Sequence, residues 1–460
     1  MKYLLLVFLA ILLFSCQSED ISAQEGFNFR DVATHLDTPW EILWGPDDHI
    51  WMTERYGRIS RVNPETGDVQ ELITMVDVFE GGERGLLGMV LHPDFDTNPY
   101  VYVAYNTGND NQSTDVNLAR LTYDGEKLVD RQIIISDIQG WSNHNGSRLW
   151  ILEDNTLLMT VGDAHFSDRA QDNSNINGTI IRINLDGSIP ADNPIEDSRI
   201  YINGSRNAQG LVVHNGIIYS SEHGPDTDDE VNIIKAGRNY GWPDVKGYCD
   251  EASEMSFCEE HNVVEPIAAW TPTLAVCGID FYDNDLIPEF ENSLLVTSLK
   301  SQTLVQLKLD ASGTEVIDEN QFFNGQFGRL RDVCVSPDGR VFIATSTRDG
   351  RGSPTEIDDR IIEVTPNING VDSKDKGGIL NVVPNPASMS ADIYFGDISH
   401  NAKIKIFDMT GRLIIQISEV AKSALNWDLR DDNGNICPNG IYHVVLLDEK
   451  IRSEKLLIKR

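Results

Sequence analysis

Basic residues are scarce in this sequence of 460 residues, because 37 lysines and arginines stand against 72 aspartates and glutamates. The resulting formal net charge of -35 repels a phosphate backbone, so nucleic acid is not an expected partner. Long apolar runs are lacking after the N-terminus, so we predict no transmembrane segment. The scarcity of cations also means that any group of them gathered by the fold calls for an anionic ligand.

Cysteine is rare as well, with six residues in the whole chain. Cys249 and Cys258 flank a short polar loop and are the pair that we expect to form a disulfide. Cys277 and Cys334 are expected to be buried thiols, because they occupy equivalent positions of neighbouring repeats, and Cys437 is expected to be free. No glycine-rich dinucleotide fingerprint and no nucleophile-elbow serine is present, which disfavours NAD, FAD and serine-hydrolase chemistry.

The N-terminus has the pattern of an export signal. Lys2 precedes an apolar run from Leu4 to Phe14, which is too short to span a membrane, so we predict a signal peptide over residues 1–22. The residues Leu13-Phe-Ser-Cys16 resemble a bacterial lipoprotein cleavage box, which leaves a lipid anchor at Cys16 as the alternative to plain secretion. In both cases the protein is expected to be secreted or held at the outer cell surface, where disulfides are permitted.

One pattern recurs six times along the chain: an apolar strand, a tight turn, a second apolar strand and a polar end. Its copies begin at Glu41, Leu86, Arg148, Gly210, Leu274 and Asp332. Six β-rich copies without helical periodicity predict an all-β fold, namely a six-bladed β-propeller over residues 28–367. An array of β-sandwiches is the weaker alternative.

The chain turns polar after the last copy, and we predict a linker over residues 368–378. Residues 379–460 then contain short alternating strands, such as the one from Ala402 to Phe407. About 80 residues of this kind predict a separate small β-sandwich domain.

Polar residues stand at the hairpin ends of five repeats. The start of the first strand and the end of the second lie at one edge of a hairpin, so a propeller gathers these positions around its axis. The residues concerned are Glu83, Asn143, His144, Arg206, Asn207, Thr273, Arg329 and Arg331 near first strands, and Gly224, Pro225 and Lys300 after second strands. Propeller rims are polar in any case, and many such side chains only cap strands. Four converging cations, Arg206, Lys300, Arg329 and Arg331, nevertheless predict an anionic ligand in so acidic a chain.

A metal site and a base are also expected at these positions. The stretch from Ser221 to Asn232 holds five acidic side chains and the Gly224-Pro225 step. Carboxylates beside free backbone carbonyls suit calcium, although a solvated acidic loop is the commoner fate of such a run. His144 is the natural general base, because imidazole titrates near working pH, whereas His92 and His223 are expected to be structural.

These residues stand in motifs that resemble those of the soluble quinoprotein glucose/sorbosone (aldose sugar) dehydrogenase family. The motifs are Gly82-Glu-Arg-Gly-Leu-Leu-Gly88, His144-Asn-Gly-Ser-Arg-Leu149, Gly204-Ser-Arg-Asn-Ala-Gln-Gly210, Ser221-Glu-His-Gly-Pro225, Ser298-Leu-Lys300 and Arg329-Leu-Arg-Asp332. The family is a six-bladed propeller that binds pyrroloquinoline quinone (PQQ) with calcium. The resemblance implies that His144, beside Arg206, removes the proton from the anomeric hydroxyl of a sugar while hydride passes to the quinone.

The resemblance also implies a binding role for each remaining site residue. Lys300, Arg329 and Arg331 would hold the carboxylates and carbonyls of PQQ, with Arg206, Asn207, Thr273 and Glu83 beside it. Gly224 and Pro225 would offer carbonyl oxygens to the calcium, and Asp229 and Glu230 match positions linked to further calcium.

Two positions depart from the family pattern. Glu83 replaces an amide, and its carboxylate would need to be protonated or turned to a cation such as Arg84. Asn143 replaces an aspartate, so the residue beside His144 is expected not to fix the imidazole tautomer as a carboxylate does.

Residues 379–460 resemble the sorting domain of the type IX secretion pathway. The matching residues are Pro384-Asn-Pro386, Met409-Thr-Gly-Arg412, Asn439-Gly-Ile-Tyr442 and Lys455-Leu-Leu-Ile-Lys459. This resemblance implies that the secretion machinery carries the chain across the outer membrane and removes this domain.

The sequence therefore predicts a secreted PQQ- and calcium-dependent enzyme that oxidises an aldose sugar to a lactone. Its electrons would pass to a separate acceptor such as a cytochrome. The alternatives are a catalytically inactive propeller that binds carbohydrate or protein, and a calcium-dependent hydrolase of the lactonase type. His144 together with the four cations favours the enzyme, because a binding module needs no such set and a lactonase would want more carboxylates aimed at the axis.

Overall fold

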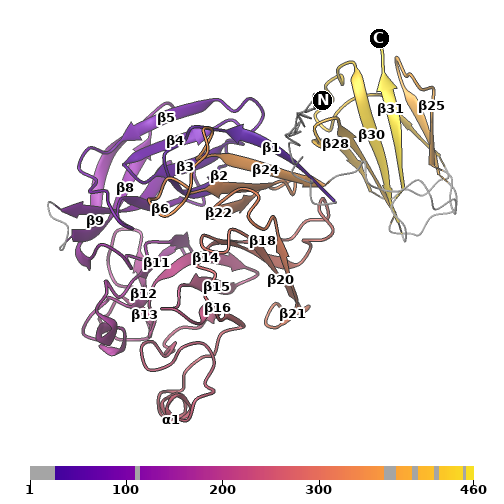
Figure 1. Cartoon of the computed structure of the whole chain (residues 1–460). Coiled ribbons are helices and arrows are strands. Elements are labelled where there is room, and N and C mark those ends of the chain that lie inside the picture. Colours follow the sequence, from indigo (N-terminus) through magenta and orange to yellow (C-terminus); the bar gives the residue numbers. More distant parts are fainter. Residues whose placement is uncertain (1–25, 109–113, 367–379, 396–401, 419–423, 449–451) are drawn as a thin grey trace, which may run out of the picture.

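The computed structural model describes residues 26–108, 114–366, 380–395, 402–418, 424–448 and 452–460. Its named strands all pair antiparallel, and the prediction of an all-β protein is confirmed. The expected signal peptide with Cys16 and the expected linker at 368–378 lie outside the described residues. Figure 1 shows a large body of sheets, coloured indigo to orange along the chain, and a smaller yellow body formed by the end of the chain.

Residues 27–366 form six four-stranded sheets, here called the ring of sheets. The first three sheets hold β2 (Pro39–Trp44), β3 (Ile50–Glu54), β4 (Arg58–Val62) and β5 (Val69–Thr74); β6 (Leu86–Leu91), β7 (Tyr100–Gly108), β8 (Thr114–Tyr123) and β9 (Leu128–Gly140); and β10 (Leu149–Ile151), β11 (Thr156–Val161), β12 (Thr179–Asn184) and β13 (Ile200–Asn203). The fourth and fifth hold β14 (Ala208–His214), β15 (Ile217–Glu222), β16 (Asp229–Ile234) and β17 (Ala268–Trp270); and β18 (Val276–Tyr282), β19 (Ser293–Ser298), β20 (Leu304–Leu309) and β21 (Val316–Phe322). The sixth holds β22 (Leu330–Val335), β23 (Val341–Thr345), β24 (Ile361–Pro366) and β1 (Phe27–Ala33).

The sheets close on themselves in chain order. The first strand of each sheet contacts the first strand of the next, from β2 through β6, β10, β14 and β18 to β22, and β22 contacts β2. The sixth sheet combines strands from both ends of residues 27–366. Its strand β1 pairs with β24, and Phe27 stands opposite Pro366. This closed order is what a six-bladed propeller requires.

In the fifth sheet the inner strands are buried and the outermost strand is exposed. Every residue of β19 is buried, whereas five residues of β21 in the same sheet are exposed. Neighbouring sheets share apolar clusters, and Trp51 and Ile59 of the first sheet pack with Leu86 and Val103 of the second. Inner strands covered on both faces are therefore continuous apolar runs, which explains why the repeat was visible in the sequence.

Two short helices interrupt this pattern, η1 (Ser167–Gln171) and α1 (Ala252–His261), although no helical periodicity was found. Apolar packing does not hold α1, since Glu254 is its one buried residue, and Glu254 instead caps the helix by accepting the N–H of Glu251 at 3.2 Å. No helix among the described residues is long and apolar enough to cross a bilayer.

The cysteine predictions are confirmed. Cys249 and Cys258 form a disulfide that ties α1 to the loop before it. Cys277, Cys334 and Cys437 are buried and unbonded.

The end of the chain forms two further sheets. The first holds β25 (Leu380–Val383), β26 (Ala391–Phe395) and β29 (Ala424–Trp427), and the second holds β28 (Leu413–Ile417), β27 (Lys403–Asp408), β30 (Gly440–Leu447) and β31 (Arg452–Ile458). Ile393 and Trp427 of the first sheet and Ile406 and Val444 of the second belong to one apolar cluster. The two sheets thus bury their apolar faces against each other.

One carboxylate between the fifth and sixth sheets makes the stability of the ring depend on pH. Burial raises the pKa of Asp280 from 3.8 to about 7, although its oxygens accept the N–H groups of Val335 and Phe281, each at 2.8 Å. Because the folded pKa lies above the unfolded value, the stabilising contribution is complete below about pH 4 and is lost as the pH rises through about 7.

We therefore expect the difference in unfolding free energy between Asp280→Asn and the wild type to change by roughly 4 kcal/mol, in favour of the variant, as the pH rises from about 4 to 8. Urea unfolding at both pH values measures the difference. Asp283→Asn is the control, because that carboxylate is 68% exposed. If the unfolding free energies of the wild type and of Asp280→Asn changed equally with pH, the role given to Asp280 would be contradicted.

Candidate active site

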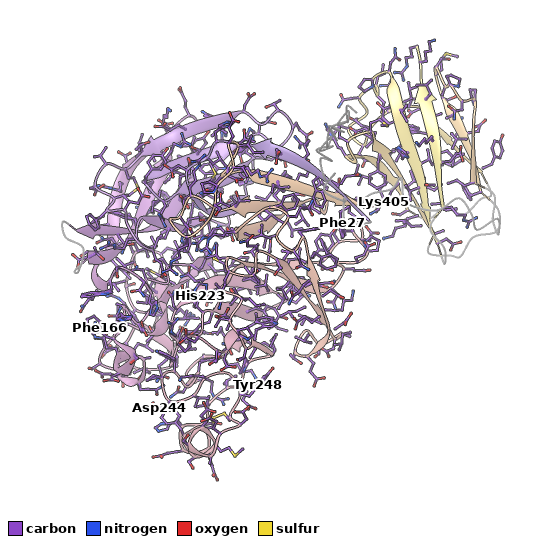
Figure 2. All side chains as sticks on the ribbon, viewed as in Figure 1. Phe27, Phe166, His223, Asp244, Tyr248 and Lys405 are labelled. Atoms are coloured by element: carbon purple, nitrogen blue, oxygen red, sulfur yellow. A yellow bond between two sulfur atoms is a disulfide. The ribbon has the colours of Figure 1, made fainter. Side chains whose placement is uncertain are left out.

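A cavity of about 390 Å³ is lined by hairpin ends from all six sheets. It brings together ten of the predicted site residues: Glu83, His144, Arg206, Gly224, Pro225, Asp229, Thr273, Lys300, Arg329 and Arg331. His223, which lines the same cavity, lies near the centre of the large body in Figure 2. Asn207 and Glu230 are not in its lining.

His144 is held by its ring and by its backbone. Its Nδ1 lies 2.8 Å from Oδ1 of Asp163, and the side chain is 9% exposed. The backbone is in the left-handed region with φ 57°, and its N–H donates to Oε2 of Glu83 at 3.0 Å. Since a carboxylate can only accept, Nδ1 carries the proton and Nε2 is left as the acceptor that a general base needs.

Asp163 is the principal site residue that the sequence analysis missed. His144 does have a carboxylate partner, because Asp163 supplies one from the end of β11 rather than from position 143. Oδ2 of Asp163 also accepts the indole N–H of Trp242 at 3.0 Å, and the carboxylate is buried. Asp163 follows a second strand as Lys300 follows β19, so the hairpin-end rule itself could have found it.

Each carboxylate oxygen of Glu83 has a partner within the protein. One oxygen accepts the N–H of His144, and the other lies 3.8 Å from the guanidinium of Arg351 at the exposed side of the cavity. The predicted need for a neighbouring cation is met by Arg351, from the loop after β23. The carboxylate therefore supports the backbone of the base.

The four predicted cations line the cavity but differ in their partners. Arg329 pairs with Asp349 at 2.8 Å, so its charge is already balanced. Nζ of Lys300 donates to the hydroxyl of Thr273 at 3.0 Å, and Arg331 donates to Oε1 of Gln209 at 3.3 Å. Within the part of the chain that the structure describes, neither Lys300 nor Arg331 makes an ion pair.

Burial lowers the pKa values of two further residues of the cavity, Arg206 and His223. It lowers the pKa of Arg206, whose guanidinium donates to the carbonyl of His223 at 3.0 Å and lies 5.3 Å from the ring of Trp242. Burial, followed by the charges of Arg331 and Arg206, lowers the pKa of His223 to about 3. His223 is therefore neutral at working pH, which fits its predicted structural role.

Gly224 and Pro225 form a turn at the cavity wall. A Cβ at Gly224 would lie 1.9 Å from the carbonyl oxygen of Thr227, so the turn requires glycine. Asp229 shapes it by accepting the N–H of Gly224 at 2.8 Å. Among the described residues, no hydrogen bond reaches the carbonyl oxygens of Gly224 and Pro225, which leaves both free to bind a cation.

The two predicted acidic ligands have other partners. Both oxygens of Asp229 accept backbone N–H groups, from Gly224 and from Val276. Glu230 accepts from the N–H of Gly247 and from the side chain of Asn232, each at 2.8 Å. No cluster of three or more metal-binding side chains occurs in the described ranges, so a metal role for Asp229 and Glu230 stays a prediction.

Unsatisfied nitrogens indicate what the cavity would bind. Three residues of the lining have a buried nitrogen without a hydrogen-bond partner among the described residues, namely Nε of Arg206, Nε of Arg331 and Nε2 of His223. Buried nitrogens of this kind are costly unless a ligand satisfies them. Together with the unpaired cations, they fit a ligand that carries several anionic oxygens, and the two free carbonyls fit a hard cation beside it.

Comparison with known proteins points to the same chemistry. Residues 36–362 match the family described as Glucose / Sorbosone dehydrogenase, and residues 381–460 match the Secretion system C-terminal sorting domain. The chain is 31% identical to quinoprotein glucose dehydrogenase B of Acinetobacter calcoaceticus over 458 residues, which covers 79% of this chain and 90% of that protein.

Two further relatives agree. Aldose sugar dehydrogenase YliI of Escherichia coli is 29% identical over 340 residues, with 70% of this chain and 91% of that protein covered. The solved PQQ-bound form of aldose sugar dehydrogenase from Streptomyces coelicolor is 31% identical, with a TM-score of 0.65, and covers 74% of this chain and 98% of that one.

Proposed function

This chain belongs to the glucose/sorbosone dehydrogenase family, and on that premise we propose that it oxidises the anomeric hydroxyl of an aldose sugar to a lactone, using PQQ and calcium. The observation that carries the proposal is one cavity that holds an oriented imidazole together with Lys300 and the buried Arg331, neither of which makes an ion pair among the described residues. We also propose that the ring of sheets is a six-bladed propeller and that residues 380–460 are a small β-sandwich.

The cavity residues divide the work of binding. Lys300, Arg329 and Arg331 would hold the carboxylates and carbonyls of PQQ, with Arg206 completing the cationic wall. The carbonyl oxygens of Gly224 and Pro225 would ligate the calcium. When bound, PQQ supplies a hydride acceptor and the calcium supplies a Lewis acid.

The protein's own contribution to the chemistry is a proton acceptor at a defined atom. Nε2 of His144 would take the proton of the anomeric hydroxyl, because Asp163 holds the proton of the ring on Nδ1. The carboxylate also stabilises the imidazolium that forms, as in other carboxylate–histidine pairs. Glu83 and the left-handed backbone of His144 keep the ring in place.

The C-terminal sorting domain indicates that the protein is secreted or displayed at the cell surface. Electrons would then leave for a separate acceptor outside the cell. A lipid anchor at Cys16 lies outside the described residues and stays a prediction.

Reconstitution tests the proposal. Purified full-length protein is titrated with PQQ and calcium and assayed with a dye acceptor on a panel of sugars. We expect saturable PQQ binding at micromolar concentration and sugar-dependent dye reduction that is lost when a chelator removes calcium and regained when calcium is restored. Failure to bind PQQ would contradict the proposal. PQQ binding without any sugar oxidation, with no difference between the wild type and His144→Ala, would favour a binding module over an enzyme.

A further inference from the structure

The C-terminal sorting domain contacts the ring of sheets through an ion pair in which the lysine is buried and the aspartate is 29% exposed. Oδ1 of Asp285, in the loop after β18, lies 2.5 Å from Nζ of Lys405, and Lys403 pairs with the other oxygen. The Lys405 side chain is 2% exposed. A buried ammonium group is tolerated only where a partner compensates it, so the position of Lys405 depends on Asp285.

The pKa values of this pair have the directions expected for a contact that excludes water. Burial lowers the pKa of Lys405 and Asp285 raises it, with a net fall. Burial raises the pKa of Asp285, but hydrogen bonds from Lys403 and Lys405 outweigh this and lower it. Asp285 therefore remains the charged partner of both lysines at working pH.

An apolar cluster lies next to this ion pair, because Val445 stands opposite Lys405 in the sheet. Phe407 of β27 and Val445 of β30 are 2% and 3% exposed. They belong to the same apolar cluster as Phe27 of β1, Tyr282 and Phe290 of the ring. Figure 2 shows Phe27 and Lys405 on the two sides of the contact. The core of the ring thus continues into the sorting domain at the strand that closes the ring.

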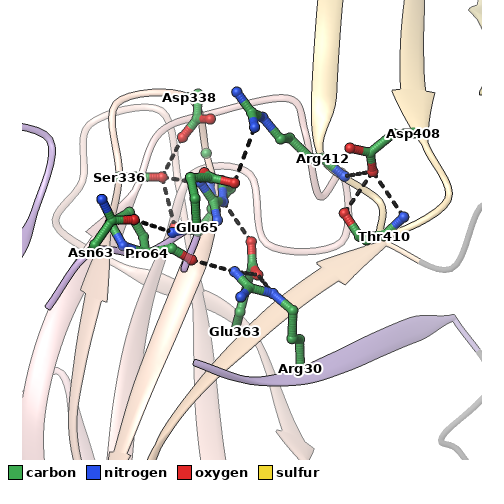
Figure 3. Close-up of polar contacts among 12 residues, drawn as sticks. Arg30, Asn63, Pro64, Glu65, Ser336, Asp338, Glu363, Asp408, Thr410 and Arg412 are labelled. Carbon is green, nitrogen blue, oxygen red and sulfur yellow. Dashed lines mark hydrogen bonds and ion pairs between the residues drawn. The ribbon is translucent and has the colours of Figure 1, made fainter. Parts of the chain in front are cut away.

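A chain of ion pairs forms the second part of the contact. Arg412 of the sorting domain pairs with Glu65 at 3.1 Å, and the other oxygen of Glu65 pairs with Arg340 at 2.7 Å. Arg340 pairs with Glu363 of β24 at 2.5 Å, and Glu363 pairs with Arg30 of β1 at 2.6 Å. Figure 3 shows that this chain runs from the sorting domain to the paired strands β1 and β24.

The turn between β27 and β28 approaches the same strands. A Cβ at Gly411 would lie 2.7 Å from the hydroxyl of Thr365 on β24, and Gly411 has φ 86°, so a larger residue would disturb the contact. Three separate observations therefore place the sorting domain over the junction of β1 and β24.

We propose that this face of the ring is a docking site for the chain's own sorting domain, which clamps the junction of β1 and β24 and stays bound after the linker is cut. Asp285 is the central contact, because it is the partner of the buried Lys405 beside the apolar cluster. Cutting a peptide bond in the linker breaks none of these contacts. The sorting domain would then leave only when something competes for them.

The test uses the full-length chain with a protease recognition sequence inserted between residues 370 and 376. After complete cleavage, size-exclusion chromatography with light scattering gives the mass of the product. We expect the two pieces to elute together at the mass of one uncut chain. Pieces that separate at micromolar concentration would overturn the proposal, as would elution at twice that mass, which would mean docking between two chains.

Two variants assign the contact to Asp285. We expect Asp285→Asn to weaken the association of the cut pieces by roughly 30-fold or more, because it leaves the buried ammonium of Lys405 without its partner. Lys405→Met should weaken the association less, because Asp285 is 29% exposed and keeps Lys403 as a partner. Asp283→Asn is the matched control, since this carboxylate lies two residues away, is 68% exposed and is 3.7 Å from His214 of the ring. Circular dichroism confirms that each variant is folded. Equal affinities for Asp285→Asn and Asp283→Asn would overturn the role of Asp285.

Hydrogen exchange tests the clamp itself. In the cut complex the amides of β1 and β24 should be protected as in the intact chain. Once the pieces are separated, these amides should exchange at least about 10-fold faster, whereas those of β11 should not change. Unchanged exchange in β1 would overturn the clamping role.

Discussion

His144→Ala is expected to lower kcat for sugar oxidation by roughly 10²- to 10⁴-fold, the range that a general base contributes. PQQ binding should be nearly unchanged, because the residues assigned to its carboxylates are Lys300, Arg329 and Arg331. Stopped-flow reduction of the reconstituted enzyme by sugar measures the chemical step directly. A rate within about 3-fold of the wild type would contradict the assignment of the base.

Asp163→Asn tests how the base is prepared, and it should lower kcat by a comparable factor. An asparagine can turn its amide N–H toward Nδ1, which favours the tautomer with the proton on Nε2 and removes the acceptor. Sugar-dependent dye reduction at saturating PQQ and calcium measures the loss of kcat. Asp168→Asn, an exposed position in the same segment, is the control and should leave kcat unchanged.

Arg148→Leu is expected to cost roughly 3–5 kcal/mol of folding stability, the largest loss that we predict for the fold. The guanidinium of Arg148 lies 2.6 Å from Glu41 and 3.0 Å from Asp332, and its side chain is 4% exposed. It also donates to the carbonyl of Gln209 at 2.5 Å, so one side chain ties the first, third, fourth and sixth sheets together. Its removal leaves two buried carboxylates without a counter-ion.

The pH dependence separates this mechanism from a simple loss of packing. Burial already raises the pKa of Glu41, so without Arg148 both carboxyls should take up protons in the folded state. The loss of folding free energy caused by Arg148→Leu should therefore become smaller as the pH falls toward about 5. Arg131→Leu removes a surface pair with Asp77 and should cost about 1 kcal/mol or less. Equal losses for the two variants in urea unfolding would contradict a role for the buried charges.

The six sheets were predictable because their inner strands are apolar on both faces and recur with similar spacing. The closing strand β1 was not, since Phe27–Ala33 finds its partner more than 300 residues away and carries no local pairing signal. The helix α1 was missed for a related reason: a cap and a disulfide hold it, and neither gives an apolar period.

The cavity was predictable to the extent that hairpin geometry decides it. His144, Lys300 and Arg331 were expected at one edge of their hairpins, and all three line the cavity. The position of a residue along its strand decides at which end of the ring its side chain lies. The partners of these residues come from loops, where spacing carries no such information. Asp349, which balances Arg329, and Arg351, which faces Glu83, both lie in the loop after β23, and no pattern in the sequence places that loop.

The pairing of β1 with β24 has a consequence for biosynthesis. The first strand of the ring to leave the ribosome must wait, unpaired, until almost the last residues before the sorting domain have been made. A truncated translation product therefore keeps an open edge that cellular proteases can attack. The sorting domain follows β24 in the chain, so every chain that carries the complete sorting domain also carries both strands of the closing pair.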